Sequence, residues 1–520
     1  MVGMTASSAL IAVAALATAF LQGPATLQGP ATTTAPPPLR WSSCPTEIGA
    51  PGLQCATLEV PLDHRDPRSR KIDIAVSRLP SEDPSKRRGV LLTNLGGPGG
   101  GSGLDSPVIL RELGLPQSVR DAYDIVTFDP RGVGRSTAVD CGLTAAQVRN
   151  GYPPPYPTEP ADVARQARTA KAMAARCAAS RTAWLLPHTT TASTARDMDL
   201  IRRALREPSI SYLGYSYGTY LGAVYATLFP GHTDRFVLDS NLGATGYDVT
   251  ATRLLARGLE DRFADFAAFA ATHPEYGLGT TPERVHATYF ALAQRLDEKM
   301  SQGIDGSLFR WLSHAFTYND AQFPLLAETW QALDTGRPLP DSVVSGIERQ
   351  SSESLSGHLA VLCADSRWPR SVQTYRRNIA ADRISHPMLG GAAANIGPCA
   401  FWPAEPVEPP VRVTDRGPSN VLLTQNTRDP GTPLSGARQM RQALGGRARM
   451  VTVDAGGHGV YVLGANACAN DTVTRFLTTG HRPAHDLTCT ADGPSRSGGA
   501  VARSQGTSEE RRNTRVWELR

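Results

Sequence analysis

The pentapeptide "GYSYG", with Ser216 at its centre, constrains the fold of this chain more than any other stretch. Residues 210–213 before it are typical of the end of a buried strand, and residues 217–229, which begin directly after Ser216, carry apolar side chains at helical spacing. A chain that turns this sharply brings its backbone together at Gly214 and Gly218, where a Cβ would not fit. The sequence therefore predicts a tight strand–turn–helix that raises the Ser216 hydroxyl above the end of a sheet. An ordinary glycine-flanked turn is the alternative.

Other apolar runs, each leading into a loop, indicate the class of sheet. They lie at residues 90–94, 124–128, 234–240, 420–433 and 449–461. Residues 191–206, just before the serine turn, have the apolar spacing of a helix. Strands that alternate with helices, and that are apolar along most of their length, indicate a mainly parallel sheet with helices on both faces. The predicted fold class is therefore α/β.

Residues 246–410 have a different pattern, with helical apolar spacing and no intervening strands. We interpret this segment as an inserted, mostly helical cap. The core is then made of residues 40–245 and 411–490. Residues 1–39 are interpreted as a signal peptide and low-complexity linker. Residues 491–520 are rich in Ser, Arg and Gly with little to bury, so we expect a disordered tail there.

The N-terminal segment predicts export from the cell. Residues 9–21 form an apolar run that is too short to span a bilayer but suits the core of a signal peptide. No positive charge precedes this run, so a membrane-proximal anchor or a misplaced start codon are the alternatives. We expect a secreted, extracellular protein with no stable membrane insertion once the signal is removed.

Composition narrows the classes of partner. Hydrophobic residues make up 41% of the chain and charged residues 19%, which is typical of a globular protein. The net charge is +5, but no lysine-rich run or basic stripe is present, so we do not expect nucleic acid as a partner. The sequence does not predict the oligomeric state.

The eight cysteines indicate disulfides, because an even number follows an export signal. Eight cysteines allow 105 pairings, and reduced thiols are the alternative. We expect sequential local pairing: Cys44–Cys55, Cys141–Cys177, Cys363–Cys399 and Cys468–Cys489. None of the cysteines forms a C-x-x-C pair, and we interpret His481 and His485 as surface residues, so we expect neither a metal nor a cofactor.

A serine at such a turn needs a base and an acid that orients the base. His458 is the candidate base, because it follows a late strand within the loop "AGGHG". Asp429 follows the strand before it and precedes the turn "PGTP". The order Ser, acid, His, each after a strand, is that of α/β-hydrolases. Asp239, at the end of an earlier strand, is the competing candidate for the acid.

The negative charge that develops on a carbonyl oxygen during attack needs backbone N–H donors, each worth about 3 kcal/mol. Tyr217, which follows the serine, is the first candidate donor. The second is expected in the loop "NLGGPGGGSG", because this loop follows directly after a buried strand and its glycines allow close approach of the backbone. A plain flexible linker is the alternative interpretation of the loop.

These motifs together resemble the secreted tripeptidyl aminopeptidases related to prolyl iminopeptidases, which are α/β-hydrolases. The motifs are "GGPGG" at 96–100, "FDPRGVGRS" at 128–136, "GYSYGTYLG" at 214–222, "DPGTP" at 429–433 and "GGHG" at 456–459. The resemblance implies a serine exopeptidase with a helical cap that removes short peptides, expected to be tripeptides, from free N-termini. It also implies Ser216 as nucleophile, Asp429 as acid, His458 as base and Gly97 as the oxyanion donor beside Tyr217. Prolyl iminopeptidases usually have H-G-G-P-G, whereas Asn94 and Leu95 precede the glycines here.

An exopeptidase that acts on peptide or protein N-termini must also bind a free ammonium, for which a buried carboxylate is the natural counter-charge. Asp365, beside a predicted disulfide, is the candidate amine-binding residue, and Glu275 and Glu283 in the cap are others. Each of them is a solvated or structural carboxylate in the alternative interpretation. An esterase or lipase with the same triad is the alternative function, and a non-catalytic binding protein is a third.

Overall fold

The computed structural model of this chain describes residues 36–48, 50–99, 103–348 and 351–491. The predicted signal segment and linker, apart from residues 36–39, and the predicted tail, apart from residue 491, lie outside the described residues. Within the described part, no helix is long and apolar enough to cross a membrane.

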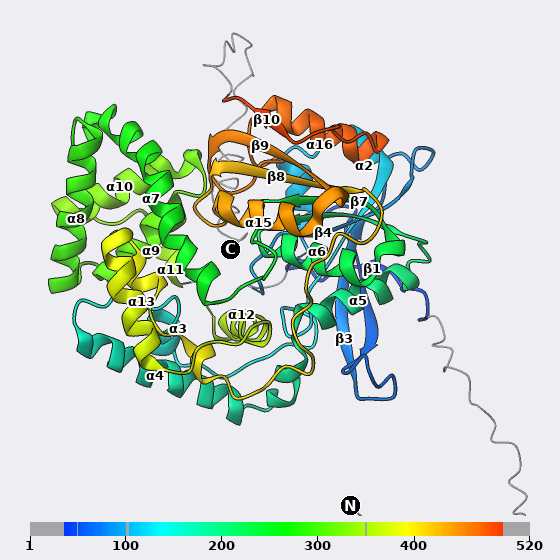
Figure 1. Cartoon of the computed structure of the whole chain (residues 1–520), viewed down its shortest axis with the longest axis horizontal. Helices are drawn as coiled ribbons and strands as arrows, with labels where there is room; N and C mark the ends of the chain where they lie inside the picture. Colours follow the sequence, from blue (N-terminus) through cyan, green and yellow to red (C-terminus); the bar gives the residue numbers. More distant parts are fainter. Residues whose placement is uncertain (1–35, 49, 100–102, 349–350, 492–520) are drawn as a thin grey trace, which may run out of the picture. The chain divides into compact units, whose positions relative to one another are not determined.

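Ten strands in the described residues form one sheet in the order β1-β2-β3-β5-β4-β6-β7-β8-β9-β10 (Figure 1). The strands are β1 (Ser42–Ser43), β2 (Gln54–Pro61), β3 (Lys71–Leu79), β4 (Gly89–Asn94), β5 (Tyr123–Phe128), β6 (Ile210–Tyr215), β7 (Thr233–Asp239), β8 (Val421–Arg428), β9 (Ala448–Gly456) and β10 (Leu487–Cys489). Pairing is antiparallel from β1 to β5 and parallel from β5 to β10. The mainly parallel sheet predicted from the sequence is confirmed.

Helices cover both faces of this sheet, which is why its central strands are apolar along their length. Every residue of β4, β5 and β6 is buried. Leu92 packs in one cluster with α5, α6 and α15, whereas Leu91 packs in another with α1, α2 and α16, so the two clusters lie on opposite faces. The helices are α1 (Ser106–Glu112), α2 (Gln117–Ala122), α5 (Thr191–Ala204), α6 (Tyr217–Leu228), α15 (Leu434–Leu444) and α16 (Ala467–Thr479).

A run of helices separates β7 from β8 in the sequence (Figure 1). It comprises α7 (Val249–Ala271), α8 (Pro282–Glu298), α9 (Gly306–Phe316), α10 (Phe323–Thr335), α11 (Asp341–Glu348), α12 (Ser352–Ala364), α13 (Val372–Ser385) and α14 (Gly390–Ala393). Helices α7 to α10 and α14 share a hydrophobic cluster of their own around Trp330, which is fully buried. This arrangement is what an amphipathic helical insertion needs in order to be stable.

Two features cross the expected boundaries of the cap. The apolar side chains of α12 pack in the same cluster as the sheet, although α12 lies within residues 246–410. Two helices that precede the serine turn, α3 (Ala145–Gly151) and α4 (Pro160–Ala179), lie outside that range, yet α4 packs against α13. The domain boundaries at 245/246 and 410/411 therefore stay predictions.

Short helical turns complete the described chain. They are η1 (Ala183–His188), η2 (Pro230–His232), η3 (Pro274–Tyr276), η4 (Asp320–Gln322), η5 (Pro398–Phe401) and η6 (Gly445–Arg447). Four disulfides join the cysteines in sequential order, as predicted, at sequence separations of 11, 36, 36 and 21 residues. Such bridges persist in oxidising compartments.

Candidate active site

Ser216 stands between the last residue of β6 and the first residue of α6, at φ 54° and ψ −122°. A positive φ is costly for a residue with a side chain and is seen mainly where the surroundings impose it. A Cβ on Gly214 would lie 2.5 Å from the Gly218 carbonyl oxygen, and one on Gly218 would lie 2.5 Å from the Asn94 carbonyl oxygen. The flanking glycines are therefore required by close backbone approach, as the sequence predicted.

The loop after β4 lies directly against this turn, because Asn94 of β4 is paired with Gly214 of β6. A Cβ on Gly96 would lie 2.8 Å from the Ser216 Cβ and 3.4 Å from the Tyr217 amide nitrogen. Gly96 and Gly97 both have positive φ, 104° and 103°. Tyr217 is the first residue of α6, so its N–H has no partner within the helix. The candidate oxyanion donors Tyr217 and Gly97 are thus on neighbouring stretches of backbone.

His458 and Asp429 form a hydrogen-bonded pair at the ends of β9 and β8. His458 Nδ1 lies 2.9 Å from Asp429 Oδ1 and 3.0 Å from Oδ2. Asp429 also accepts hydrogen bonds from the Gly431 and Thr432 amides, both at 2.8 Å, and from Thr432 Oγ1 at 2.9 Å. The Asp429 side chain is 0% exposed and that of His458 is 15% exposed. This geometry favours the tautomer with the proton on Nδ1, which leaves Nε2 able to accept a proton.

Asp239, the competing candidate, contacts the backbone instead of the imidazole. Its Oδ1 accepts the Val460 N–H at 2.9 Å and its Oδ2 accepts the Tyr461 N–H at 2.7 Å, while its carbonyl oxygen accepts the Ser216 N–H at 3.0 Å. Burial raises the pKa of Asp239 to about 6. Asp239 therefore joins the serine turn to the loop that carries His458.

Two tyrosines at the site had no signal in the sequence. Tyr318, between α9 and η4, accepts the His458 N–H on its carbonyl oxygen at 2.8 Å, and its ring meets the imidazole edge-on at 4.8 Å between centroids. Tyr247 lies close enough to Ser216 to influence its electrostatics, and burial raises the pKa of Tyr247 to about 12, so the phenol stays protonated at neutral pH. Both residues lie in irregular segments next to cap helices. Such segments have no periodic sequence pattern from which the position of a side chain could be predicted.

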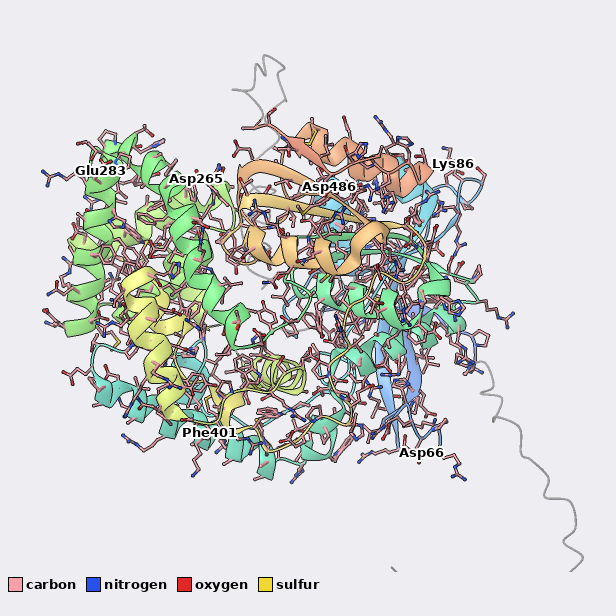
Figure 2. The ribbon with its side chains drawn as sticks, viewed as in Figure 1. Asp66, Lys86, Asp265, Glu283, Phe401 and Asp486 are labelled. Atoms are coloured by element: carbon pink, nitrogen blue, oxygen red, sulfur yellow. A yellow bond between two sulfur atoms is a disulfide. The ribbon has the colours of Figure 1, made fainter. Side chains whose placement is uncertain are left out.

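The three candidate amine-binding carboxylates have different environments. Glu275 and Glu283 are exposed on turns at the ends of helices; Glu283 lies in the first turn of α8 (Figure 2). Asp365 is buried, and both of its oxygens accept hydrogen bonds from Thr191, at 2.7 Å from the amide and 2.5 Å from the hydroxyl. Burial raises the pKa of Asp365 to about 7. In the described residues, no three His, Cys, Asp or Glu side chains cluster as a metal ion would require.

A mainly parallel sheet with a serine at a strand–helix turn, followed by an aspartate and a histidine at later strand ends, defines an α/β-hydrolase. A family model described as "TAP-like protein" matches residues 386–489. A tripeptidyl aminopeptidase of Streptomyces lividans is 34% identical over 466 residues, covering 86% of each chain. Serine protease Hip1 of Mycobacterium tuberculosis is 28% identical, over 87% of this chain and 91% of that one. Carboxylesterase B of the same organism is 29% identical, over 87% and 90%.

The chain belongs to the tripeptidyl aminopeptidase family, as its resemblance predicted, and the protein is a serine hydrolase of the aminopeptidase class.

Proposed function

We propose that this protein is a secreted serine exopeptidase that releases tripeptides from free N-termini through Ser216, Asp429 and His458. The observation that carries the proposal is the His458–Asp429 pair, which is joined to the serine turn through Asp239. The tripeptidyl aminopeptidase relative supports the substrate class, since it matches 86% of this chain.

In the proposed mechanism, His458 Nε2 takes the Ser216 proton while Oγ bonds to the carbonyl carbon of the scissile peptide. Asp429 keeps the imidazole in the productive tautomer and stabilises its positive charge. The N–H groups of Tyr217 and Gly97 bind the oxyanion. The C–N bond then breaks, and the amine leaves with the proton from His458. Water attacks the acyl-enzyme by the same steps in reverse and frees the tripeptide.

Secretion is part of the proposal for two reasons. The four disulfides suit a protein that folds in an oxidising compartment. The apolar run at residues 9–21 has the length of a signal-peptide core.

An esterase is the second candidate, because a relative named Carboxylesterase B matches 87% of this chain. The two candidates share the nucleophile and differ in whether they require a free amine on the acyl side of the substrate.

Covalent labelling tests the proposed nucleophile. A fluorophosphonate should modify one residue, Ser216, and peptide mapping by mass spectrometry should find the adduct there. The Ser216→Ala variant should remain unlabelled and lose turnover while keeping the circular dichroism spectrum of the wild type. Labelling at another residue, or substantial turnover by the variant, would contradict the assignment.

A further inference from the structure

A chain of buried polar groups runs from the end of α12 to the first residue of the serine-turn helix. It joins Asp365, which follows α12, Thr191, the first residue of α5, and Tyr217, the first residue of α6. Thr191 Oγ1 donates to Asp365 Oδ2 at 2.5 Å and is also hydrogen-bonded to the Tyr217 hydroxyl. The three residues are 5%, 1% and 1% exposed. Water therefore has little access to these hydrogen bonds.

The ionised form of Asp365 fixes the direction of this chain. A carboxylate only accepts hydrogen bonds, so the single hydroxyl proton of Thr191 must point at Asp365. The lone pairs of Thr191 Oγ1 are then left to accept the proton of the Tyr217 phenol. Burial raises the pKa of Tyr217 well above its ordinary value, so that phenol remains a donor. The ring of Tyr217 is thereby tied at its far end to a buried carboxylate.

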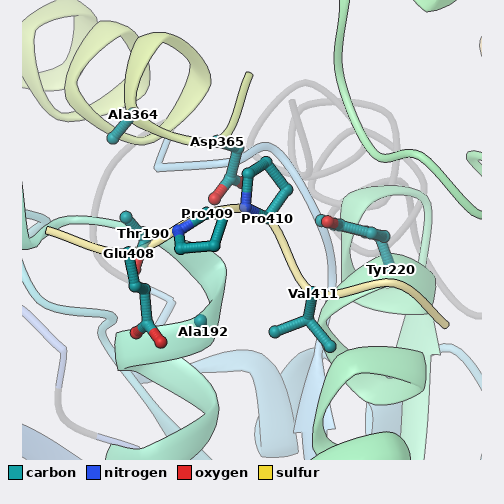
Figure 3. A pocket seen from close by; sticks show the side chains of 9 residues that line it. All are labelled: Thr190, Ala192, Tyr220, Ala364, Asp365, Glu408, Pro409, Pro410 and Val411. Atoms are coloured by element: carbon teal, nitrogen blue, oxygen red, sulfur yellow. The ribbon is translucent and has the colours of Figure 1, made fainter. Parts of the chain in front are cut away.

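The surroundings of Asp365 do not favour an ammonium ligand. The hollow beside it, bordered by Tyr220, Pro409 and Pro410, is too small to hold a water molecule (Figure 3). Glu408, the other carboxylate at this hollow, is paired with Arg196 at 2.5 Å. Both oxygens of Asp365 are already bound to Thr191. Each oxygen can still accept a second hydrogen bond, but Asp365 is only 5% exposed, so a substrate amine would have to enter a closed site to reach it.

The position of the Tyr217 backbone matters for catalysis in the proposed mechanism. Its amide is the proposed oxyanion donor, and it directly follows Ser216, whose φ of 54° is costly. An oxyanion donor must lie within about 0.5 Å of its productive position to be effective. A tie on the ring of Tyr217 limits how far its backbone can relax away from that position.

We propose that Asp365 is a positioning residue, which fixes the oxyanion-binding amide of Tyr217 through Thr191, and is not the ligand of the substrate ammonium. This assignment rests on the proposed function, because it takes Tyr217 as the oxyanion donor. It adds a role for a carboxylate that contacts neither the nucleophile nor the base.

Two inhibitors separate the possible roles of Asp365. Phenylboronic acid forms a tetrahedral adduct with an active serine and needs the oxyanion donors, but it has no ammonium. The tripeptide Ala-Ala-Ala has a free ammonium and forms no adduct. Assays at pH 8, above the pKa of about 7 for Asp365, keep the carboxyl ionised in the wild type. Inhibition constants, kcat and KM are measured on the full-chain enzyme.

For Asp365→Asn we expect kcat to fall about ten-fold, a part of the loss seen when an oxyanion donor is removed outright. KM should change by less than about two-fold, because the substitution does not affect how the substrate binds in the ground state. The inhibition constant of phenylboronic acid should rise by the same factor as kcat falls, and that of Ala-Ala-Ala should not change. Thr191→Val should behave in the same way, whereas Thr191→Ser keeps the hydroxyl and should restore wild-type values.

Tyr217→Phe is the mildest variant, because it keeps the backbone amide and removes only the phenol oxygen. It should reproduce the effect of Asp365→Asn, and the double variant should be no worse than either single one, since both break the same chain.

A rise in the inhibition constant of Ala-Ala-Ala alone would make Asp365 an amine ligand. A lower melting temperature with unchanged kinetics would make it merely structural. Either result overturns the proposal. Phenylboronic acid also inhibits a serine esterase. Its inhibition constants therefore still test the role of Asp365 if the protein proves not to be an aminopeptidase.

Discussion

Asp239 and Asp429 stand at the ends of neighbouring strands, and their contacts assign them different roles. Asp429 meets the imidazole of His458, and Asp239 meets the backbone on either side of the site. Replacing either aspartate with asparagine turns the NH₂ group of the new side chain toward a group that donates a hydrogen bond, so that hydrogen bond is lost. The consequence depends on whether that donor is the imidazole of the proposed base or a structural amide.

We expect Asp429→Asn to lower kcat by about four orders of magnitude with little change in stability, because the imidazole is then held in the wrong tautomer. Asp239→Asn is the matched control. It should lower the free energy of unfolding by about 1–3 kcal/mol, because a buried backbone N–H loses its acceptor, and should reduce kcat far less. Steady-state kinetics and thermal unfolding measure the two effects. A larger loss of kcat in Asp239→Asn than in Asp429→Asn would exchange the two roles.

At the scale of single elements, the turn between β6 and α6 depends on two glycines that have no space for a side chain. We expect Gly214→Ala to prevent folding or to abolish activity, because its Cβ would lie 2.5 Å from the Gly218 carbonyl oxygen. Gly231→Ala, in η2, is the control, since its Cβ would meet nothing within 4 Å. Soluble yield, melting temperature and turnover are measured for both. A Gly214→Ala variant as stable and active as Gly231→Ala would show that the turn tolerates a side chain.

The elements that the sequence predicted are those with a local pattern. The strands at 90–94 and 124–128 are β4 and β5, each one residue longer at its start, because a buried parallel strand is a continuous apolar run. The serine turn was predictable because its glycines are required by backbone contact. The packing of α12 on the sheet cluster was not predictable, since a helix that is apolar on most sides does not reveal which neighbour it meets.

In the whole molecule, the contacts that we could not predict from the sequence join segments that are far apart along the chain. Tyr318 reaches His458, and Asp365 reaches Thr191, across well over a hundred residues. No spacing rule connects such pairs, and a carboxylate beside a disulfide fits amine binding as well as positioning until its partners are known. The disulfides have the sequential pairing that we expected, but eight cysteines allow 105 pairings, so the sequence alone did not determine it.

The central claim concerns the whole enzyme, and a pair of substrates tests it most directly. A tripeptide anilide with a free N-terminus is compared with its N-acetylated twin, using the purified protein. The account predicts that only the free amine is cleaved, and that mass spectrometry finds the intact tripeptide beside the released aniline. Equal cleavage of both substrates would contradict it, and would make the protein an endopeptidase or a general esterase built on the same triad.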